Sequence, residues 1–223
     1  MTTLTLNQTE AIKNSLAKML PGESILWRNV TWREYKQLTE ELTDWPGKRL
    51  TYDRGSLEIM SPLAKPEQYK ELLSAIGRLI SYETEIDVEC LGSTTFTEAW
   101  LDKGAEPDTC FYVANTAAII GKQRIDLNTD PPPDIAVEVD ISSPSIRKLP
   151  IYEEMRVPEV WLYDEQKLRI FLLGKNGYDE SPVSKSFSLI TSEALTQALE
   201  QSKTQGQTAV LRKFRTWLRA RLA

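Results

Sequence analysis

Three acidic side chains near the middle of the chain are separated by even numbers of positions. From Asp134 to Ile141 polar and apolar residues alternate, and in a β-strand this spacing puts Asp134, Glu138 and Asp140 on one face and aliphatic side chains on the other. Carboxylates on one face repel each other, and burial makes their charges costly. A bound divalent cation would neutralise them. The alternative is an edge strand whose polar face meets solvent.

A second acid and a lysine flank this strand in the sequence. Residues 106–113 are a strand candidate that opens with a proline, which lets Asp108 lie beside Glu138 on a neighbouring strand. Downstream, a serine- and proline-containing break leads to Lys148 and a helix candidate at 149–155. Two acids and a lysine are suited to metal-assisted phosphodiester hydrolysis, in which carboxylates hold a hard cation and an ammonium group orients water or offsets charge.

These residues resemble a known group of nucleases. Asp108 in a Pro-Asp dipeptide, then Glu138, then Lys148 is similar to the PD-(D/E)XK nuclease superfamily, and within it to the Uma family of restriction-type endonucleases abundant in cyanobacteria. The resemblance extends from about residue 32 to residue 187. Its specific stretches are 50–62, 92–95, 106–108, 131–143, 149–152 and 157–161.

The resemblance implies a role for each site residue. Asp108 and Glu138 would be ligands of Mg²⁺ or Mn²⁺, and Lys148 would be the catalytic lysine. Asp140 stands two residues after Glu138, where the superfamily normally has its lysine, so it is either an extra ligand or the mark of a weakened site. Glu67 is the acid near which the family tends to have a histidine, and it is a further candidate ligand.

The surroundings of Glu67 favour two interpretations. An apolar stripe from Tyr69 to Ile80 has helical spacing, and its centre falls nearly opposite Glu67. Glu67 would therefore face solvent inside that helix, as an acid favoured at a positive helix end. It would reach the metal site only from a non-helical position just before the first turn.

Contacts with DNA require a local basic patch, because the formal net charge is −5. Lys103, Lys122 and Arg124 flank the Asp108 strand and are candidates. Tyr152 lies four residues after Lys148 on the same helical face, where it either steadies the lysine or approaches a phosphate. The last residues form a basic amphipathic helix whose charged face is solvated, binds phosphate or contacts a second subunit.

The composition excludes several classes of enzyme. The chain has no histidine, so Ser-His-Asp and Cys-His mechanisms and histidine-dependent zinc sites are ruled out. The two cysteines, Cys90 and Cys110, are too few for a zinc ribbon, and we expect them to be free thiols. No phosphate-binding loop of the Gly-x-x-x-x-Gly-Lys-Ser/Thr type is present.

The predicted fold belongs to the α/β (α+β) class, with a restriction-endonuclease-like mixed β-sheet flanked by helices. We divide the chain into an N-terminal helical extension (1–30), a nuclease-like domain (31–190) and C-terminal helices with a basic end (191–223). Expected helices are 5–19, 31–43, 68–82, 117–121 and 149–155, and expected strands are 49–52, 57–60, 88–91, 106–113, 134–141, 160–163 and 168–173.

The leading hypothesis is a metal-dependent endonuclease that acts on DNA. A nuclease-like fold without catalysis, serving as a DNA-binding or protein-binding module, is the second, and hydrolysis of another phosphodiester is the third. The sequence lacks a membrane span and a secretion signal, and a reducing cytoplasm is the expected setting. A homodimer is an alternative to a monomer, because two-fold symmetry suits double-strand breaks.

Overall fold

Two β-sheets and the helices around them make up the described part of the chain, which is residues 5–41, 47–61, 63–141 and 147–222 of a computed structural model. The antiparallel sheet has the order β1-β3-β2-β6-β5, and the mixed sheet has the order β11-β10-β9-β8-β7-β4. The strands of the antiparallel sheet are β1 (Ser24–Arg28), β2 (Arg49–Asp53), β3 (Ser56–Met60), β5 (Phe96–Glu98) and β6 (Lys103–Ala105). Those of the mixed sheet are β4 (Glu89–Cys90), β7 (Thr109–Tyr112), β8 (Ile135–Val139), β9 (Glu159–Tyr163), β10 (Leu168–Gly174) and β11 (Gly177–Ser181).

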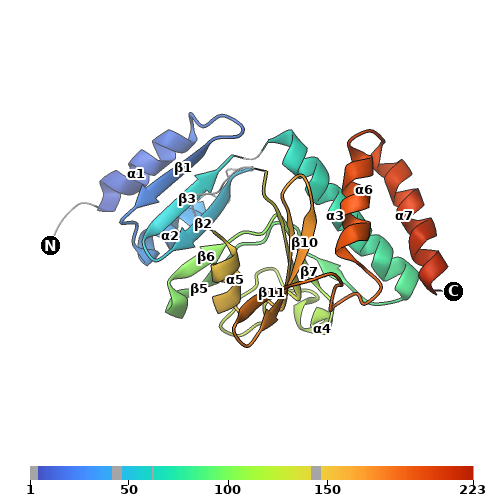
Figure 1. Cartoon of the computed structure of the whole chain (residues 1–223). Coiled ribbons are helices and arrows are strands. Elements are labelled where there is room, and N and C mark those ends of the chain that lie inside the picture. Colours follow the sequence, from blue (N-terminus) through green and yellow to red (C-terminus); the bar gives the residue numbers. More distant parts are fainter. Residues whose placement is uncertain (1–4, 42–46, 62, 142–146, 223) are drawn as a thin grey trace.

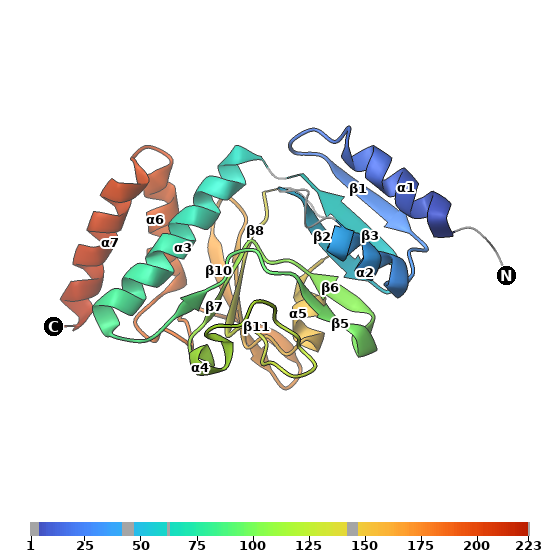
Figure 2. The same ribbon diagram turned by 180° about the vertical axis from the view of Figure 1, so that it is seen from behind.

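The helices cover the sheets in separate groups (Figures 1 and 2). They are α1 (Thr5–Leu16), α2 (Trp32–Glu41), α3 (Ala64–Thr84), α4 (Thr116–Ile119), α5 (Leu149–Glu154), α6 (Ser192–Ser202), α7 (Gln207–Leu222) and the 3₁₀ helix η2 (Ala99–Leu101). Helices α1 and α2 accompany the antiparallel sheet, whereas α3, α6 and α7 pack together on one face of the mixed sheet. The short helix α5 contacts both β6 and β11, so it lies between the two sheets.

Strand β8 is the centre of the mixed sheet. It pairs antiparallel with β7 (Cys110 opposite Ala136) and parallel with β9 (Ala136 opposite Val160), and α5 lies in the crossover between β8 and β9. All five of its residues are buried. The alternative of an edge strand with a solvated polar face is therefore wrong.

The two faces of β8 belong to different hydrophobic cores. Ile135, Val137 and Val139 pack in the core formed with α3, α6 and α7. Ala136 packs in the core that contains the α5 residues Ile151 and Tyr152. Because side chains alternate along a strand, Glu138 shares the α5 face with Ala136. The buried acid is therefore held on the side of the sheet that faces the antiparallel sheet.

The predicted mixed sheet flanked by helices is confirmed, and the antiparallel sheet adds to it. Segment 1–30 contains α1 as expected, and it also contains β1, which pairs with β3. Helix α3 begins at Ala64 rather than at residue 68, so Glu67 lies within its first turn. Of the two interpretations of Glu67, the position at the helix start is therefore confirmed, and the non-helical position before the first turn is wrong.

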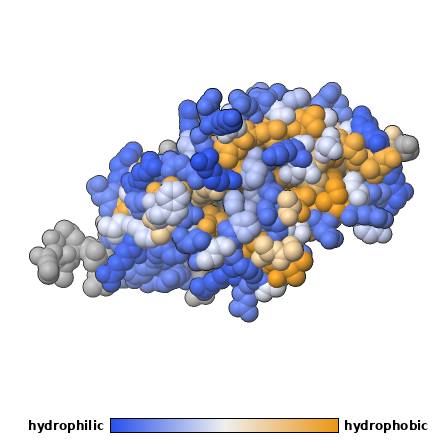
Figure 3. Space-filling model, turned by 90° about the horizontal axis from the view of Figure 1, so that it is seen from below, coloured by the Kyte–Doolittle hydropathy of each residue, from blue (hydrophilic) through white to orange (hydrophobic). Residues whose placement is uncertain are grey.

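Two other expectations concern the cysteines and membranes. Cys90 and Cys110 are free, and Cys110 is buried, as predicted. None of the helices in the described ranges combines the length and the apolar character needed to cross a bilayer. The face in Figure 3 is mostly hydrophilic, with hydrophobic residues gathered in patches between the polar ones.

Candidate active site

Asp108 and Glu138 come from neighbouring strands and line the same cavity. Asp108 directly precedes β7, and its backbone N–H donates to the Val137 carbonyl. The Asp108 Oδ2 accepts a hydrogen bond from the Val139 N–H at 2.7 Å, which fixes the carboxylate against the end of β8. The predicted approach of the two acids across adjacent strands is therefore seen in the structure.

Lys148 and Tyr152 hold the Glu138 carboxylate from α5. The Lys148 Nζ donates to Glu138 Oε2 at 2.8 Å and to the Glu106 carbonyl at 2.9 Å. The Tyr152 hydroxyl donates to the other oxygen, Oε1. Lys148 immediately precedes α5, with Pro150 in the first turn, and a spacing of four residues brings Lys148 and Tyr152 to one side of the helix.

Burial dominates the electrostatics of the site. Loss of solvation raises the pKa of Glu138 to about 7, and the nearby Asp108 carboxylate adds to the rise, while Lys148 opposes it. Burial alone lowers the pKa of Lys148, yet the Glu138 and Asp108 charges outweigh it and raise that pKa above its ordinary value. The pKa of Glu138 therefore lies near neutral pH, beside a charged lysine.

A cavity of about 780 Å³ opens over these residues. It is lined by both sheets, since β2 and β3 contribute Thr51 and Met60, and β9 and β10 contribute Leu162 and Phe171. Five acidic and four basic side chains line it: Glu58, Asp108, Glu138, Asp140 and Asp164, with Arg49, Arg147, Lys148 and Arg169. The charge of its lining is therefore slightly negative when all nine groups are ionised.

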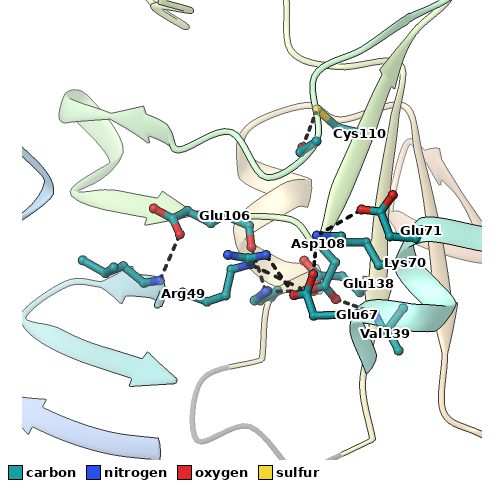
Figure 4. A network of polar contacts seen from close by, with 12 residues as sticks. Arg49, Glu67, Lys70, Glu71, Glu106, Asp108, Cys110, Glu138 and Val139 are labelled. Carbon is teal, nitrogen blue, oxygen red and sulfur yellow. Dashed lines mark hydrogen bonds and ion pairs between the residues drawn. The ribbon is translucent and has the colours of Figure 1, made fainter. Parts of the chain in front are cut away.

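Arg49 reaches this site from the antiparallel sheet (Figure 4). Its Nη2 donates to Glu67 Oε1 at 3.1 Å, and its Nε lies 3.9 Å from Asp108 Oδ1. Glu67 also binds Lys70 one turn further along α3. Glu67 therefore approaches the site through Arg49 and Lys70, from inside the helix.

The remaining predicted metal ligands do not complete a larger cluster. Within the described residues, no group of three or more Asp, Glu or Cys side chains is arranged to hold a metal ion. Asp140 lines the cavity, and burial raises its pKa. Asp108 and Glu138 are the pair that the structure brings together around Lys148.

The predicted nucleic-acid contacts need two corrections. Lys103 is 2% exposed and pairs with Asp53 and Glu154, so it cannot reach a phosphate. Tyr152 is completely buried and its hydroxyl donates to Glu138, so it holds that acid rather than the lysine and cannot contact a phosphate. Arg124 is exposed, and Lys122 is exposed in an ion pair with Asp130.

The basic C-terminal helix is partly neutralised within the fold. In α7, Arg215 and Arg219 both bind Glu83 of α3, and Arg221 lies over the Trp217 ring at 4.0 Å. Val210, Phe214 and Leu218 are buried against the mixed-sheet core. The apolar face of this helix is thus packed as predicted.

Arg49 and Glu106 also contact the site residues, and their contacts were not predicted from the sequence. The Glu106 carboxylate accepts hydrogen bonds from the Thr95 hydroxyl and the Leu50 N–H, and its backbone carbonyl accepts from Lys148. The alternation of Arg49 and Thr51 with buried Leu50 was a usable signal, because it predicts that these two side chains share a face. It does not say which strand that face meets.

Comparison with known proteins identifies the family of this chain. The family Uma2, described as "Putative restriction endonuclease", matches residues 32–205. A crystal structure described as "a putative nuclease belonging to DUF820", from Anabaena variabilis, is 16% identical and covers 76% of this chain and 99% of its own, with a TM-score of 0.48. A search of curated proteins gives no significant match. Because the family match spans most of the sequence, the chain belongs to the Uma2 family.

Proposed function

We propose that this protein is a metal-dependent endonuclease that hydrolyses DNA phosphodiester bonds. Asp108 and Glu138 would hold a divalent cation, Mg²⁺ or Mn²⁺, and Lys148 would act at the reacting phosphate. The family description supports a nuclease, and the choice of residues rests on the site itself. This assignment places the chain in the PD-(D/E)XK group.

One observation carries the proposal. Asp108, Glu138 and Lys148 come from a strand start, a central strand and a helix start, and they meet at one cavity. Buried acids are usually paired with cations of the protein. Here the positive charge of Lys148 interacts with both Glu138 and Asp108. Placing such an arrangement beside open space is typical of an active site.

The residues fit a hard divalent cation. Mg²⁺ prefers oxygen ligands and is commonly held by one or two carboxylates, with water filling the other positions. Each carboxylate offers about four lone-pair sites, so the hydrogen bonds to Lys148, Tyr152 and Val139 leave room for a metal ion. A cation would also favour the ionised form of Glu138, whose pKa burial has raised.

The protein's own groups have separate tasks in this reaction. When bound, the cation supplies polarisation of the phosphate and a more acidic water. Lys148 remains charged between Glu138 and the Glu106 carbonyl, where its ammonium group would orient the water or stabilise the negative charge that develops. Tyr152 keeps the Glu138 carboxylate in place.

The direct test is cleavage by purified variants. We expect Asp108→Ala and Glu138→Ala each to abolish cleavage of plasmid and single-stranded DNA in Mg²⁺ or Mn²⁺, because each removes a metal ligand. Asp87→Ala is the matched control, since Asp87 is an exposed acid outside the cavity lining. Circular dichroism would confirm that every variant is folded. Undiminished cleavage by either acid variant would refute the assignment.

A catalytically inactive module for binding DNA or protein is the second candidate. It is favoured by the protein partners that the acids already have. Both oxygens of Glu138 accept hydrogen bonds from the protein, and Asp108 lies near Arg49. Asp140 in the usual lysine position points the same way. This candidate predicts DNA retention in a gel-shift assay with no metal-dependent products. A homodimer, which would suit double-strand cleavage, is tested by sedimentation in the presence of DNA.

A further inference from the structure

Arg49 is a mostly buried cation on the wall of the cavity opposite the acids. It begins β2 of the antiparallel sheet, whereas Asp108 and Glu138 belong to the mixed sheet. Its side chain is 11% exposed, and Figure 4 shows it extending toward Glu67 and Asp108. Arg49 therefore brings a positive charge to the acids from the other sheet.

The guanidinium of Arg49 is not fully used by these contacts. A guanidinium has five N–H donors, and one of them is hydrogen-bonded to Glu67. The Nε is buried without a hydrogen-bond partner, because its distance of 3.9 Å to Asp108 Oδ1 is too long for a hydrogen bond. A buried donor without an acceptor is costly, so such a group in a native fold calls for a ligand or another explanation.

We propose that Arg49 binds a phosphate group of the nucleic-acid strand in the cavity, with its guanidinium fork on the phosphate oxygens. This inference rests on the proposed function and adds a substrate-binding residue to it. Arginine is suited to the task because its planar fork matches two phosphate oxygens at once. Without substrate, the same donors rest against Glu67 and Asp108.

The neighbours of Arg49 make this exchange feasible. Glu67 is also paired with Lys70, so it keeps a cation when Arg49 turns toward a phosphate. Asp108 would acquire the divalent cation as its partner instead. Cation binding and phosphate binding by Arg49 are therefore expected to favour each other, since the metal relieves Arg49 of its ionic contact with Asp108.

The alternative is that Arg49 only ties the two sheets together through its acids. A tie of this kind predicts that Arg49 affects stability and leaves nucleic-acid affinity unchanged. Binding without cleavage separates the two roles. The probe is a short fluorescein-labelled DNA oligonucleotide, single-stranded or duplex, measured by anisotropy in EDTA and in Ca²⁺ over a series of NaCl concentrations.

We expect Arg49→Gln to weaken the Ca²⁺-dependent affinity by about 10- to 100-fold, as for loss of a charge-assisted hydrogen-bond pair. The slope of log affinity against log salt should fall by about 0.7 to 0.9, the value for one phosphate contact. Arg49→Lys keeps the charge and loses the fork, so its affinity should lie between the two. Arg54→Gln is the matched control, because Arg54 is exposed on the same hairpin and pairs with Glu154.

Each outcome decides the assignment. Equal affinity and equal salt slope for the wild type and Arg49→Gln, or an equal loss in Arg54→Gln, would overturn it, as would the absence of oligonucleotide binding by the wild type. If Arg49→Gln does not fold, Arg49→Lys takes its place, and wild-type affinity in that variant would count against the fork. Cleavage that survives Asp108→Ala refutes the nuclease mechanism separately, because the binding measurement involves no cleavage.

Discussion

Two lysines with largely buried side chains each face carboxylates, but in different settings. Lys148 binds Glu138 at the edge of the cavity between the sheets. Lys103 of β6 lies 3.2 Å from Asp53 and 3.0 Å from Glu154, and this pairing joins the antiparallel sheet to α5. The side chain of Lys103 is 2% exposed and that of Lys148 is 13% exposed. Similar residue types therefore build one accessible site and one internal tie.

The acids of the two clusters also differ in their electrostatics. Burial raises the pKa of Glu138 to about 7 in spite of Lys148. Partial burial of Glu154 acts in the same direction, but hydrogen bonds and charges from Lys103 and Arg54 outweigh it and lower the pKa of Glu154. Glu154 is thus stabilised as an anion, whereas Glu138 has less compensation than its burial demands. Under-compensated charge beside open space is the feature that distinguishes the candidate active site.

Replacing each lysine with methionine should have the largest effects, on cleavage at one site and on stability at the other. We expect Lys148→Met to lower the cleavage rate by about 100- to 1,000-fold, because it removes a positive charge at the reacting phosphate. Lys103→Met should preserve cleavage by the folded molecules and lower the free energy of unfolding by about 2 kcal/mol, since Asp53 and Glu154 each lose their ionic contact with Lys103. Single-turnover cleavage and urea unfolding measure the two effects.

The two variants serve as controls for each other. Both remove one buried ammonium group and keep a chain of similar length, so they differ in location. A large loss of cleavage in Lys103→Met, with the fold intact, would place the internal tie in the catalytic machinery. If Lys148→Met cleaved DNA at the wild-type rate, the proposed catalytic role of Lys148 would be wrong.

Local pattern was sufficient to predict the mixed-sheet half of the site. The alternation before Asp140 and the proline before Asp108 identify two strands, and Pro150 identifies the helix that follows Lys148. These features act over a few residues. They led to the correct expectation that Asp108, Glu138 and Lys148 meet.

The antiparallel half of the site depends on contacts that no short segment contains. Strands β5 and β6 have three residues each, which is too short for a period of two to stand out. Lys103 resembles a surface lysine until β6 is placed beside β2 and α5 covers it. The place of Arg49 in the site likewise depends on Asp108, which lies next to the mixed sheet. The start of α3 was predicted too late, at residue 68, because the helix extends about one turn beyond its apolar stripe.

Glu138 and Glu154 should affect the pH dependence of stability in opposite directions. Glu138 has an ordinary pKa of 4.5 and a folded-state pKa of about 7, so the folded chain binds its proton more tightly than the unfolded chain. The contribution of Glu138 to the free energy of unfolding should therefore fall by about 3 kcal/mol as the pH rises from about 4.5 to about 7. Urea unfolding in EDTA measures this change, and Glu138→Gln should remove it.

Glu154 supplies the control of opposite sign. Its lowered pKa means that its contribution to stability is present above its unfolded pKa and is lost as the pH falls through the folded value. Glu154→Gln should therefore flatten the acidic side of the profile and leave the fall between about pH 4.5 and 7 in place. The same fall in Glu138→Gln as in the wild type would show that another group titrates there.

Two buried tyrosines give the smallest and most closely matched comparison. The Tyr152 hydroxyl donates to Glu138 in the site, and the Tyr52 hydroxyl donates to Val30 and Asp102 in the antiparallel sheet. We expect Tyr152→Phe and Tyr52→Phe each to lower the free energy of unfolding by about 1 kcal/mol, because each leaves an acceptor unpaired.

Only the site variant should alter cleavage. The Tyr152 hydrogen bond lowers the pKa of Glu138, so its loss in Tyr152→Phe should move the pH–rate profile toward higher pH. Tyr52→Phe should keep the wild-type profile, because its hydroxyl has no contact with the cavity acids. Equal profiles for both variants would mean that Tyr152 only packs the core. A shift in Tyr152→Phe alone assigns Tyr152 to positioning the carboxylate that we propose as a metal ligand, since a purely structural loss changes stability without moving the pH optimum.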